Sequence, residues 1–267
     1  MLKVNCKPVE LNKFPDGTFL IKEKPSGDKA FISWKFESNE ELVALIYITH
    51  HLRAHGVKTI HLFMPYIPNA RQDRVKADED VFTLKYFAWV VNSLKFDKVS
   101  VLDPHSSVSE ALIERIEIMS PAYFINTVYN RVCKECSCGE NDVLMFYPDE
   151  GAMKRYSGMI SVPYAFGIKE RDWATGKIKG LFVFEGENSV KGKNILIVDD
   201  ISSRGGTFYH SAKKLKELGA EKVFLYVTHC ENTILEGEVL SSGLIEKVYT
   251  TDSLLTTTHE KIEVREL

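Results

Sequence analysis

The stretch of sequence that decides the fold is residues 195–207, which reads Ile195-Leu196-Ile197-Val198-Asp199-Asp200-Ile201-Ser202-Ser203-Arg204-Gly205-Gly206-Thr207. Its first four residues are apolar without interruption, which is typical of a strand buried on both faces of a parallel sheet. Two carboxylates follow at the carboxyl end of that strand, and a short loop of small residues then leads to a helix that is expected to begin near Thr207. In an open α/β sheet, ligands bind at this end of the strands.

The loop has the composition of a phosphate-binding site. Gly205 and Gly206 let backbone N–H groups approach a phosphate, and the amino terminus of the following helix adds partial positive charge. The adjacent carboxylates Asp199 and Asp200 do not suit the same anion; they suit ribose hydroxyls or a divalent cation instead. Residues 195–207 therefore predict a cradle for a sugar phosphate.

Along the rest of the chain, short apolar runs alternate with helical patterns. Strands are expected at 31–34, 59–64, 99–102, 143–146, 195–198 and 223–227, and helices at 39–55, 83–94 and 207–218. This alternation predicts an α/β protein with parallel sheets. A break in the pattern near 119–121 predicts two domains, 1–120 and 121–267. The Gly-rich, charged segment 169–193 is expected to be a mobile hairpin or loop.

Composition and charge exclude several classes of protein. The chain has 267 residues, of which 44% are hydrophobic and 27% are charged, unlike a disordered or fibrous chain. A formal net charge of −3 argues against a broad basic face for nucleic acid. No run approaches the ~18 apolar residues of a transmembrane helix, and the first residues lack the apolar core of a signal peptide. Five cysteines fit a reducing compartment, so a cytoplasmic protein without a membrane partner is expected.

Three patterns that look like metal or phosphate sites are expected to be incidental. Cys133, Cys136 and Cys138 form a CxxCxC cluster without an evident fourth ligand, so no zinc site is expected and the role of the cluster is left open. His51 and His55 share a helix face without other ligands. The run 186–194 fails the spacing of a P-loop and lacks its hydroxyl residue.

Several blocks of sequence, in a constant order, resemble one family. The run 195–207 resembles the phosphoribosyl-pyrophosphate motif that type I phosphoribosyltransferases share with ribose-phosphate pyrophosphokinases. Other blocks resemble the pyrophosphokinases: Phe14-Pro15-Asp16-Gly17, Pro65-Tyr66-Ile67-Pro68-Asn69-Ala70-Arg71-Gln72-Asp73-Arg74, Val101-Leu102-Asp103-Pro104-His105, Tyr147-Pro148-Asp149-Glu150-Gly151-Ala152-Met153-Lys154-Arg155, Ile168-Lys169-Glu170-Arg171, Val227-Thr228-His229 and Thr251-Asp252-Ser253. The chain thus resembles a short, divergent ribose-phosphate pyrophosphokinase.

The resemblance implies two parallel-sheet domains of the type I phosphoribosyltransferase fold. Domain 1–120 would lie on the ATP side and domain 121–267 on the ribose-phosphate side, with a flag loop at about 168–193. The implied enzyme serves nucleotide biosynthesis: it moves the β,γ-pyrophosphoryl group of Mg-ATP to the C1 hydroxyl of ribose 5-phosphate and releases AMP. Mg²⁺ is the implied cofactor, and a homo-oligomer, a dimer or larger, is the implied assembly.

The resemblance also implies a role for each matched residue. ATP would be bound by Phe14 and Asp16, in the family from a neighbouring subunit, and by Arg71, Gln72, Arg74 and His105. The metal would be held by Asp103, His105 and Asp149, and the flag residues Lys169 and Arg171 would act in catalysis with His105. The ribose phosphate would be held by Asp199, Asp200, Ser202, Ser203, Arg204, Gly205, Gly206 and Thr207.

The chain departs from the family pattern in three places. In the block that begins at Phe14, Thr18 stands where the family has Glu, which would alter the adenine contact. The opening strand and helix before Phe14 are expected to be missing. In the loop, Ser203 stands where the family has Asp, and Arg204 where it has Thr. This exchange makes the loop more electropositive and would favour a 5-diphosphate acceptor such as ADP-ribose, giving ADP-ribose pyrophosphate; alternatively, Arg204 points to solvent.

Two further hypotheses stay open. A phosphoribosyltransferase would consume the activated sugar, but it does not need the 71–74 segment or His105. An inactive regulatory homologue is disfavoured because the acid pair, His105 and the two flag cations are all retained.

Overall fold

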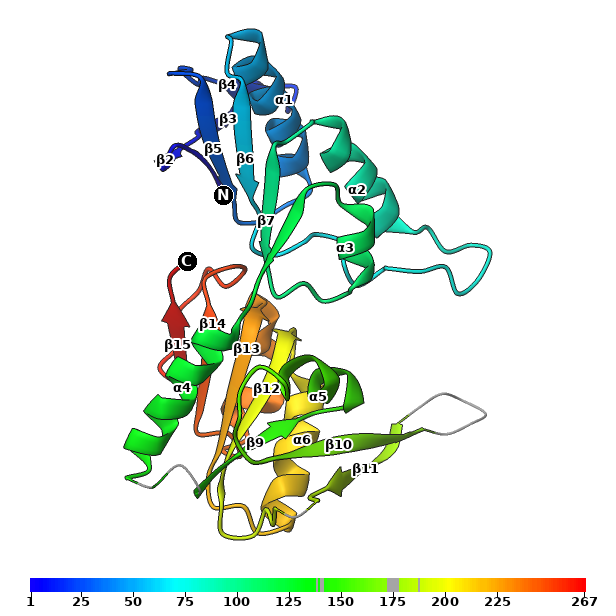
Figure 1. Cartoon of the computed structure of the whole chain (residues 1–267), viewed down its shortest axis with the longest axis vertical. Coiled ribbons are helices and arrows are strands. Elements are labelled where there is room, and N and C mark those ends of the chain that lie inside the picture. Colours follow the sequence, from blue (N-terminus) through cyan, green and yellow to red (C-terminus); the bar gives the residue numbers. More distant parts are fainter. Residues whose placement is uncertain (138, 140–141, 172–177, 187) are drawn as a thin grey trace. The chain divides into compact units, whose positions relative to one another are not determined.

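Parallel strands form the centre of the two large sheets, and antiparallel strands close one end of each of these sheets (Figure 1). The computed structural model describes residues 1–137, 139, 142–171, 178–186 and 188–267. The chain divides into two compact units, Met1–Ser120 and Pro121–Leu267. The α/β class is confirmed, with mixed rather than purely parallel sheets. Within the described residues, no helix is long and apolar enough to span a membrane.

The first unit contains a six-stranded sheet in the order β2-β1-β5-β6-β7-β8 and a separate hairpin, β3-β4. Its elements are β1 (Leu2–Val4), β2 (Lys7–Pro8), β3 (Leu11–Lys13), β4 (Phe19–Ile21), β5 (Lys29–Trp34), α1 (Glu40–Ala54), β6 (Thr59–Phe63), α2 (Thr83–Ser93), β7 (Lys98–Leu102), α3 (Val108–Leu112) and β8 (Ile116–Met119). The expected strands and helices of this half are confirmed. The expectation of a missing opening strand is wrong, because β1 pairs antiparallel with β5 and buries Leu2 and Val4.

The second unit contains a seven-stranded sheet in the order β11-β10-β9-β12-β13-β14-β15. Its elements are α4 (Ala122–Glu135), β9 (Val143–Tyr147), α5 (Glu150–Tyr156), β10 (Tyr164–Arg171), β11 (Ile178–Phe184), β12 (Asn194–Ser202), α6 (Gly206–Glu217), β13 (Val223–Cys230), the 3₁₀ helix η2 (Asn232–Glu236), α7 (Glu238–Ser241), β14 (Lys247–Thr251) and β15 (Ile262–Arg265). The expected hairpin is formed by β10 and β11, and residues 172–177 at its tip lie outside the described residues.

Strand β12 is buried on both faces, as its apolar run predicts. Ile195 and Ile197 belong to the core that contains Phe208, Ala212 and Leu215 of α6. The alternate residues Leu196 and Val198 belong to a second core, with side chains from α4 and α5. Because successive side chains of a strand point to opposite faces, the strand is covered by helices on both sides. This burial holds the carboxyl end of β12, and the acid pair on it, in place.

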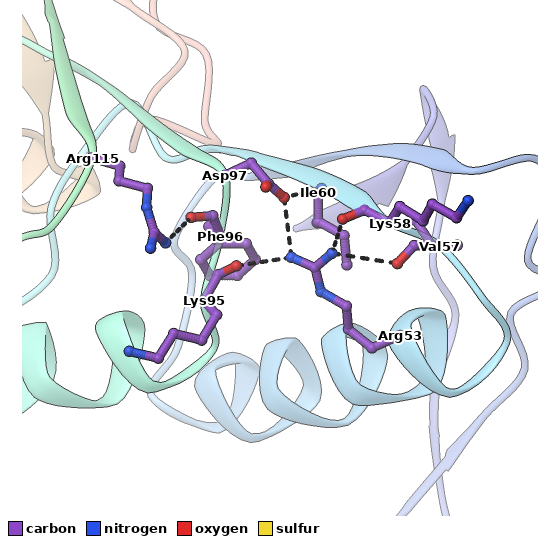
Figure 2. Close-up of polar contacts among 8 residues, drawn as sticks. All are labelled: Arg53, Val57, Lys58, Ile60, Lys95, Phe96, Asp97 and Arg115. Carbon is purple, nitrogen blue, oxygen red and sulfur yellow. Dashed lines mark hydrogen bonds and ion pairs between the residues drawn. The ribbon is translucent and has the colours of Figure 1, made fainter.

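In the first unit, Arg53 near the end of α1 connects the segments that lead into β6 and β7. Figure 2 shows its guanidinium donating to the carbonyl oxygens of Val57 (3.3 Å), Lys58 and Lys95 (2.8 Å) and to the Asp97 carboxylate (3.1 Å). The same carboxylate accepts the backbone N–H of Ile60 in β6 at 2.8 Å. One cation therefore satisfies three carbonyls and a carboxylate at the amino ends of two neighbouring strands.

Arg53→Ala should lower the free energy of unfolding of this unit by about 1–3 kcal/mol, because the lost hydrogen bonds involve a charged donor. Urea denaturation of the full chain, followed by tryptophan fluorescence, to which the buried Trp34 contributes, measures the change. Lys58→Ala is the matched control, since only the main-chain carbonyl of Lys58 takes part in the network. Equal denaturation midpoints for Arg53→Ala and the wild type would show that the network contributes nothing.

Candidate functional site

Strands β9 and β12 form the switch point of the second sheet. They are parallel neighbours, but the chain leaves β9 through α5 toward β10 and leaves β12 through α6 toward β13, in opposite directions (Figure 1). At such a point the connections diverge and leave a crevice at the carboxyl ends of the strands, where ligands bind in open α/β sheets. Asp149 directly follows Pro148 at the end of β9, and Asp199 and Asp200 lie near the end of β12. Three predicted site residues therefore lie at this end of the two strands.

The acid pair on β12 is held by a cation and a backbone hydrogen bond. Arg155 of α5 contacts Asp200, with Nη1 at 2.6 Å from Oδ2, and only 4% of Asp200 is exposed. The backbone N–H of Asp200 donates to Asp199 Oδ1 at 2.9 Å. Burial, and then the negative charge of Asp200, raises the pKa of Asp199 well above its ordinary value, and Asp149 adds to this effect. The carboxyl groups of Asp149, Asp199 and Asp200 are therefore close enough to oppose one another's ionisation.

A divalent cation would stabilise the ionised forms of these carboxyl groups. Mg²⁺ needs only one or two protein carboxylates when phosphates supply its other ligands. Among the residues that the structure describes, no three His, Cys, Asp or Glu side chains are arranged to hold a metal ion together. The acid pair with Asp149 nearby nevertheless has the oxygen donors and the charge that suit Mg²⁺.

The loop after β12 has the backbone shape of an anion site. Gly205 is left-handed, with φ of 75°, and α6 begins at the next residue, Gly206. The carbonyl of Gly205 already accepts the N–H groups of Phe208 and Tyr209, each at 2.9 Å. The N–H groups of Gly206 and Thr207 have no carbonyl upstream within the helix, because they lie in its first turn. They are suitable donors to a phosphate.

The two residues that depart from the family loop both contact the segment after β13. Ser203 donates its hydroxyl to Glu231 Oε2 at 2.6 Å. Arg204 pairs with Glu236 through Nε (3.2 Å) and Nη2 (2.8 Å), and its side chain is 71% exposed. Neither glutamate was expected from the sequence, because no motif or spacing connects them to the loop.

In the first unit, Asp73 joins two of the predicted blocks. Segment 65–74 follows β6, and Asp103 and His105 follow its parallel neighbour β7. Asp73 accepts the Ser106 hydroxyl at 2.6 Å and two N–H groups of Arg74 at 2.7 and 3.0 Å. Arg74, and Ser106 after it, lower the pKa of Asp73 to about 2, so this carboxylate stays ionised at neutral pH. Asp73 and Ser106 were not expected as site residues, although Asp73 lies inside a matched block.

The other predicted residues of the first unit lie near β6, β7 and the β3-β4 hairpin. Arg71 and Gln72 are exposed, and Gln72 accepts the Thr83 hydroxyl at 2.9 Å. Asp103 is buried and has a positive φ of 42°, a conformation that costs free energy in a non-glycine residue. Phe14 is 49% exposed at the hairpin turn, where Asp16 accepts the backbone N–H and hydroxyl of Thr18.

For the flag residues Lys169 and Arg171, the structure describes the position of the backbone. Lys169 and Arg171 lie in β10, opposite Leu181 and Ile178 of β11, with a shift in register between Glu170 and Arg171. Residues 172–177 of the predicted flag lie outside the described residues, and so does Cys138 of the cysteine cluster.

Comparisons with known proteins agree on one family. Family models match residues 1–94, as the N-terminal domain of ribose phosphate pyrophosphokinase, and residues 156–240, as a phosphoribosyl transferase domain. The ribose-phosphate pyrophosphokinase of Pyrococcus furiosus is 30% identical over 245 residues, which cover 90% of this chain and 81% of that protein. The enzyme of the same name from Thermococcus kodakarensis is 29% identical, with the same coverage of 90% and 81%.

A solved structure shares the fold over nearly the whole chain. Phosphoribosylpyrophosphate synthetase from Mycobacterium smegmatis matches with a TM-score of 0.78 at 21% identity, and the match covers 97% of this chain and 86% of that one. Together with the matched phosphoribosyl transferase domain, this likeness confirms the predicted type I phosphoribosyltransferase fold.

Arg155→Ala should destabilise the second unit by about 2–4 kcal/mol, because it leaves the buried Asp200 carboxylate without its cation. Calorimetric unfolding of the full chain measures the change. Lys154→Ala, which removes an exposed surface pair with Glu150 on the same helix, is the matched control and should change stability by less than about 0.5 kcal/mol. Adding Asp200→Asn to Arg155→Ala should restore part of the lost stability. If Arg155→Ala and Lys154→Ala cost the same, the ion pair does not hold the acid pair.

Proposed function

The chain belongs to the ribose-phosphate pyrophosphokinase family of transferases, and on that premise we propose that it transfers the β,γ-pyrophosphoryl group of ATP to the C1 hydroxyl of ribose 5-phosphate. The products are phosphoribosyl pyrophosphate and AMP. One observation carries the choice over a phosphoribosyltransferase: the Asp73–Ser106 hydrogen bond brings the 71–74 segment beside the Asp103 block. A transferase that only consumes the activated sugar does not need this second set of phosphate-binding residues.

The acceptor binds in the second unit. The N–H groups of the loop 202–207 and the amino end of α6 take the 5-phosphate, since unpaired helix N–H groups and the helix dipole favour an anion there. Asp199 and Asp200 accept hydrogen bonds from the ribose hydroxyls. Arg155 keeps Asp200 in position for this contact through the 2.6 Å ion pair.

ATP binds to the first unit. Arg71, Gln72 and Arg74 contact its phosphates, because a guanidinium fork matches phosphate oxygens. Arg74 would exchange its contact with Asp73 for the phosphate, and Asp73 stays ionised beside Ser106. Phe14 and Asp16, on the exposed turn of the β3-β4 hairpin, contact adenine from a neighbouring subunit. A homo-oligomer, a dimer or larger, is therefore part of the proposal.

Mg²⁺ is the proposed cofactor, and when bound it neutralises charge on the phosphates of ATP and the transferred group. Its proposed ligands are Asp103, His105 and Asp149. Lys169 and Arg171 stabilise negative charge that develops on the transferred group. We place the enzyme in the cytoplasm and in nucleotide biosynthesis, acting on ATP and the sugar phosphate without a nucleic-acid or membrane partner.

An acceptor assay tests the proposal. With ATP and Mg²⁺, ribose 5-phosphate should produce AMP and phosphoribosyl pyrophosphate in equal amounts, and a chelator should stop the reaction until Mg²⁺ is added back. Lys169→Ala should lower kcat by roughly 10²-fold or more with little change in ATP binding, which also shows that the activity belongs to this chain. Formation of ADP instead of AMP, or no acceptor-dependent product, would refute the proposed reaction.

The Arg204–Glu236 ion pair bears on the choice of acceptor. A 5-diphosphate such as that of ADP-ribose extends beyond the loop and could use the Arg204 guanidinium, whereas a 5-monophosphate is held by backbone N–H groups. Because Glu236 engages this guanidinium, the structure gives no preference for a longer acceptor.

Arg204→Thr should therefore change kcat/KM for ribose 5-phosphate by less than about 3-fold, since exposed ion pairs contribute little, and ADP-ribose should be a poor acceptor for both proteins. Parallel AMP-release assays with the two acceptors measure this. A loss of about 10-fold or more with ADP-ribose alone would identify the 5-diphosphate as the acceptor instead. An equal loss with both would show that Arg204 shapes the loop.

A further inference from the structure

The segment 231–239, which we call the loop brace, lies against the outer side of the phosphate loop. The backbone N–H of Glu231 donates to the carbonyl of Ser202 at 2.8 Å, and the hydroxyl of Ser203 donates to the Glu231 carboxylate at 2.6 Å. Further along the brace, Glu236 pairs with Arg204. Three consecutive loop residues thus each contact the brace.

Two glycines permit the loop and the brace to approach this closely. A Cβ atom at position 237 would lie 1.8 Å from the carbonyl oxygen of Arg204, so only glycine fits there. A Cβ atom at position 205 would lie 2.2 Å from a methyl group of Val239, and Gly205 also has the left-handed φ of 75°. The close contact therefore requires a glycine in the loop and a glycine in the brace.

Glu231 contacts the loop through both its backbone and its side chain. Its Oε2 accepts the Ser203 hydroxyl and, at 3.1 Å, the hydroxyl of Thr233 in the same segment, while its N–H holds the Ser202 carbonyl. The residue is half-buried. The charge of a carboxylate beside an anion-binding loop opposes the binding of the anion. Glu231 therefore favours binding only by holding the loop in the conformation that binds the anion.

We propose that Glu231 is a positioning residue of the phosphate loop, holding residues 202–205 in the shape that takes the 5-phosphate of the acceptor. It acts through Ser203 and the Ser202 carbonyl and does not contact the substrate. The identity of the acceptor in this inference rests on the proposed function. The statement that Glu231 holds the loop in position does not depend on the identity of the acceptor.

Glu231→Ala should weaken ribose 5-phosphate about 10-fold, because the loop loses a hydrogen bond to a charged acceptor. Titration calorimetry without ATP measures the affinity, and steady-state kinetics should show the same rise in KM for ribose 5-phosphate, with KM for ATP and kcat within about 2-fold of wild type. Glu231→Gln keeps an acceptor oxygen for Ser203 and should recover most of the affinity. Glu238→Ala, which removes an exposed glutamate of the same segment, is the matched control and should behave as wild type.

A charge cycle tests the same contact from the loop side. Ser203→Asp places a second carboxylate against Glu231 and should weaken ribose 5-phosphate by about 10-fold or more, since like charges at hydrogen-bond distance repel. Adding Glu231→Gln should relieve the repulsion and restore part of the affinity. If the two substitutions act additively, Glu231 does not act through residue 203.

Hydrogen exchange separates this inference from the proposed function. In the chain without ligand, Glu231→Ala should speed exchange of the backbone amides of residues 203–207 by about 10-fold, and Glu231→Gln and Glu238→Ala should not. Faster exchange in a protein that does not use ribose 5-phosphate would uphold the brace and refute the proposed acceptor. Unchanged exchange in Glu231→Ala, or equal loss of kcat and of affinity for both substrates, would overturn the inference.

Discussion

Two carboxylates at the end of a strand that is buried on both faces constrain the chemistry of the second unit. Asp199 and Asp200 cannot move away from each other, because the strand that carries them is packed between α6 on one side and α4 and α5 on the other. Arg155 compensates one of the charges, and burial raises the pKa of the other carboxylate. Two carboxyl groups at this position disfavour a phosphate there, so we propose that the phosphate binds to the neighbouring loop.

The phosphate loop depends on the same strand and on the segment that returns after β13. Gly205 turns the chain into α6, and Gly237 lets the brace contact the Arg204 carbonyl. With Ser203 and Arg204 in place of a loop acid and a small residue, the loop no longer carries its own carboxylate. Glu231 and Glu236 supply carboxylates from outside the loop instead. The loop and the brace are therefore packed together, and the net charge around the phosphate loop depends on the residues of both segments.

Local sequence predicts the parts of this structure whose residues are consecutive. The apolar run before Asp199, the small loop and the α6 pattern are adjacent in the chain, and they fold as expected. The Arg155–Asp200 and Ser203–Glu231 contacts join residues far apart in sequence, so only strand order and register reveal them. Strands such as β14, with the half-polar sequence Lys-Val-Tyr-Thr-Thr, lack a continuous apolar run and were missed. Lys154 and Arg155 look alike in sequence, yet only Arg155 reaches the acid pair.

We propose that the groups at the carboxyl ends of β9 and β12 bind the ribose, and that the N–H groups of the adjoining loop bind its phosphate. A crystal structure of the chain with Mg²⁺ and ribose 5-phosphate tests it most directly. Electron density for the 5-phosphate should lie against the N–H groups of residues 203–207, with ribose hydroxyls within hydrogen-bond distance of Asp199 and Asp200. A sugar phosphate bound elsewhere, or bound here with its hydroxyls turned away from both carboxylates, would contradict the account.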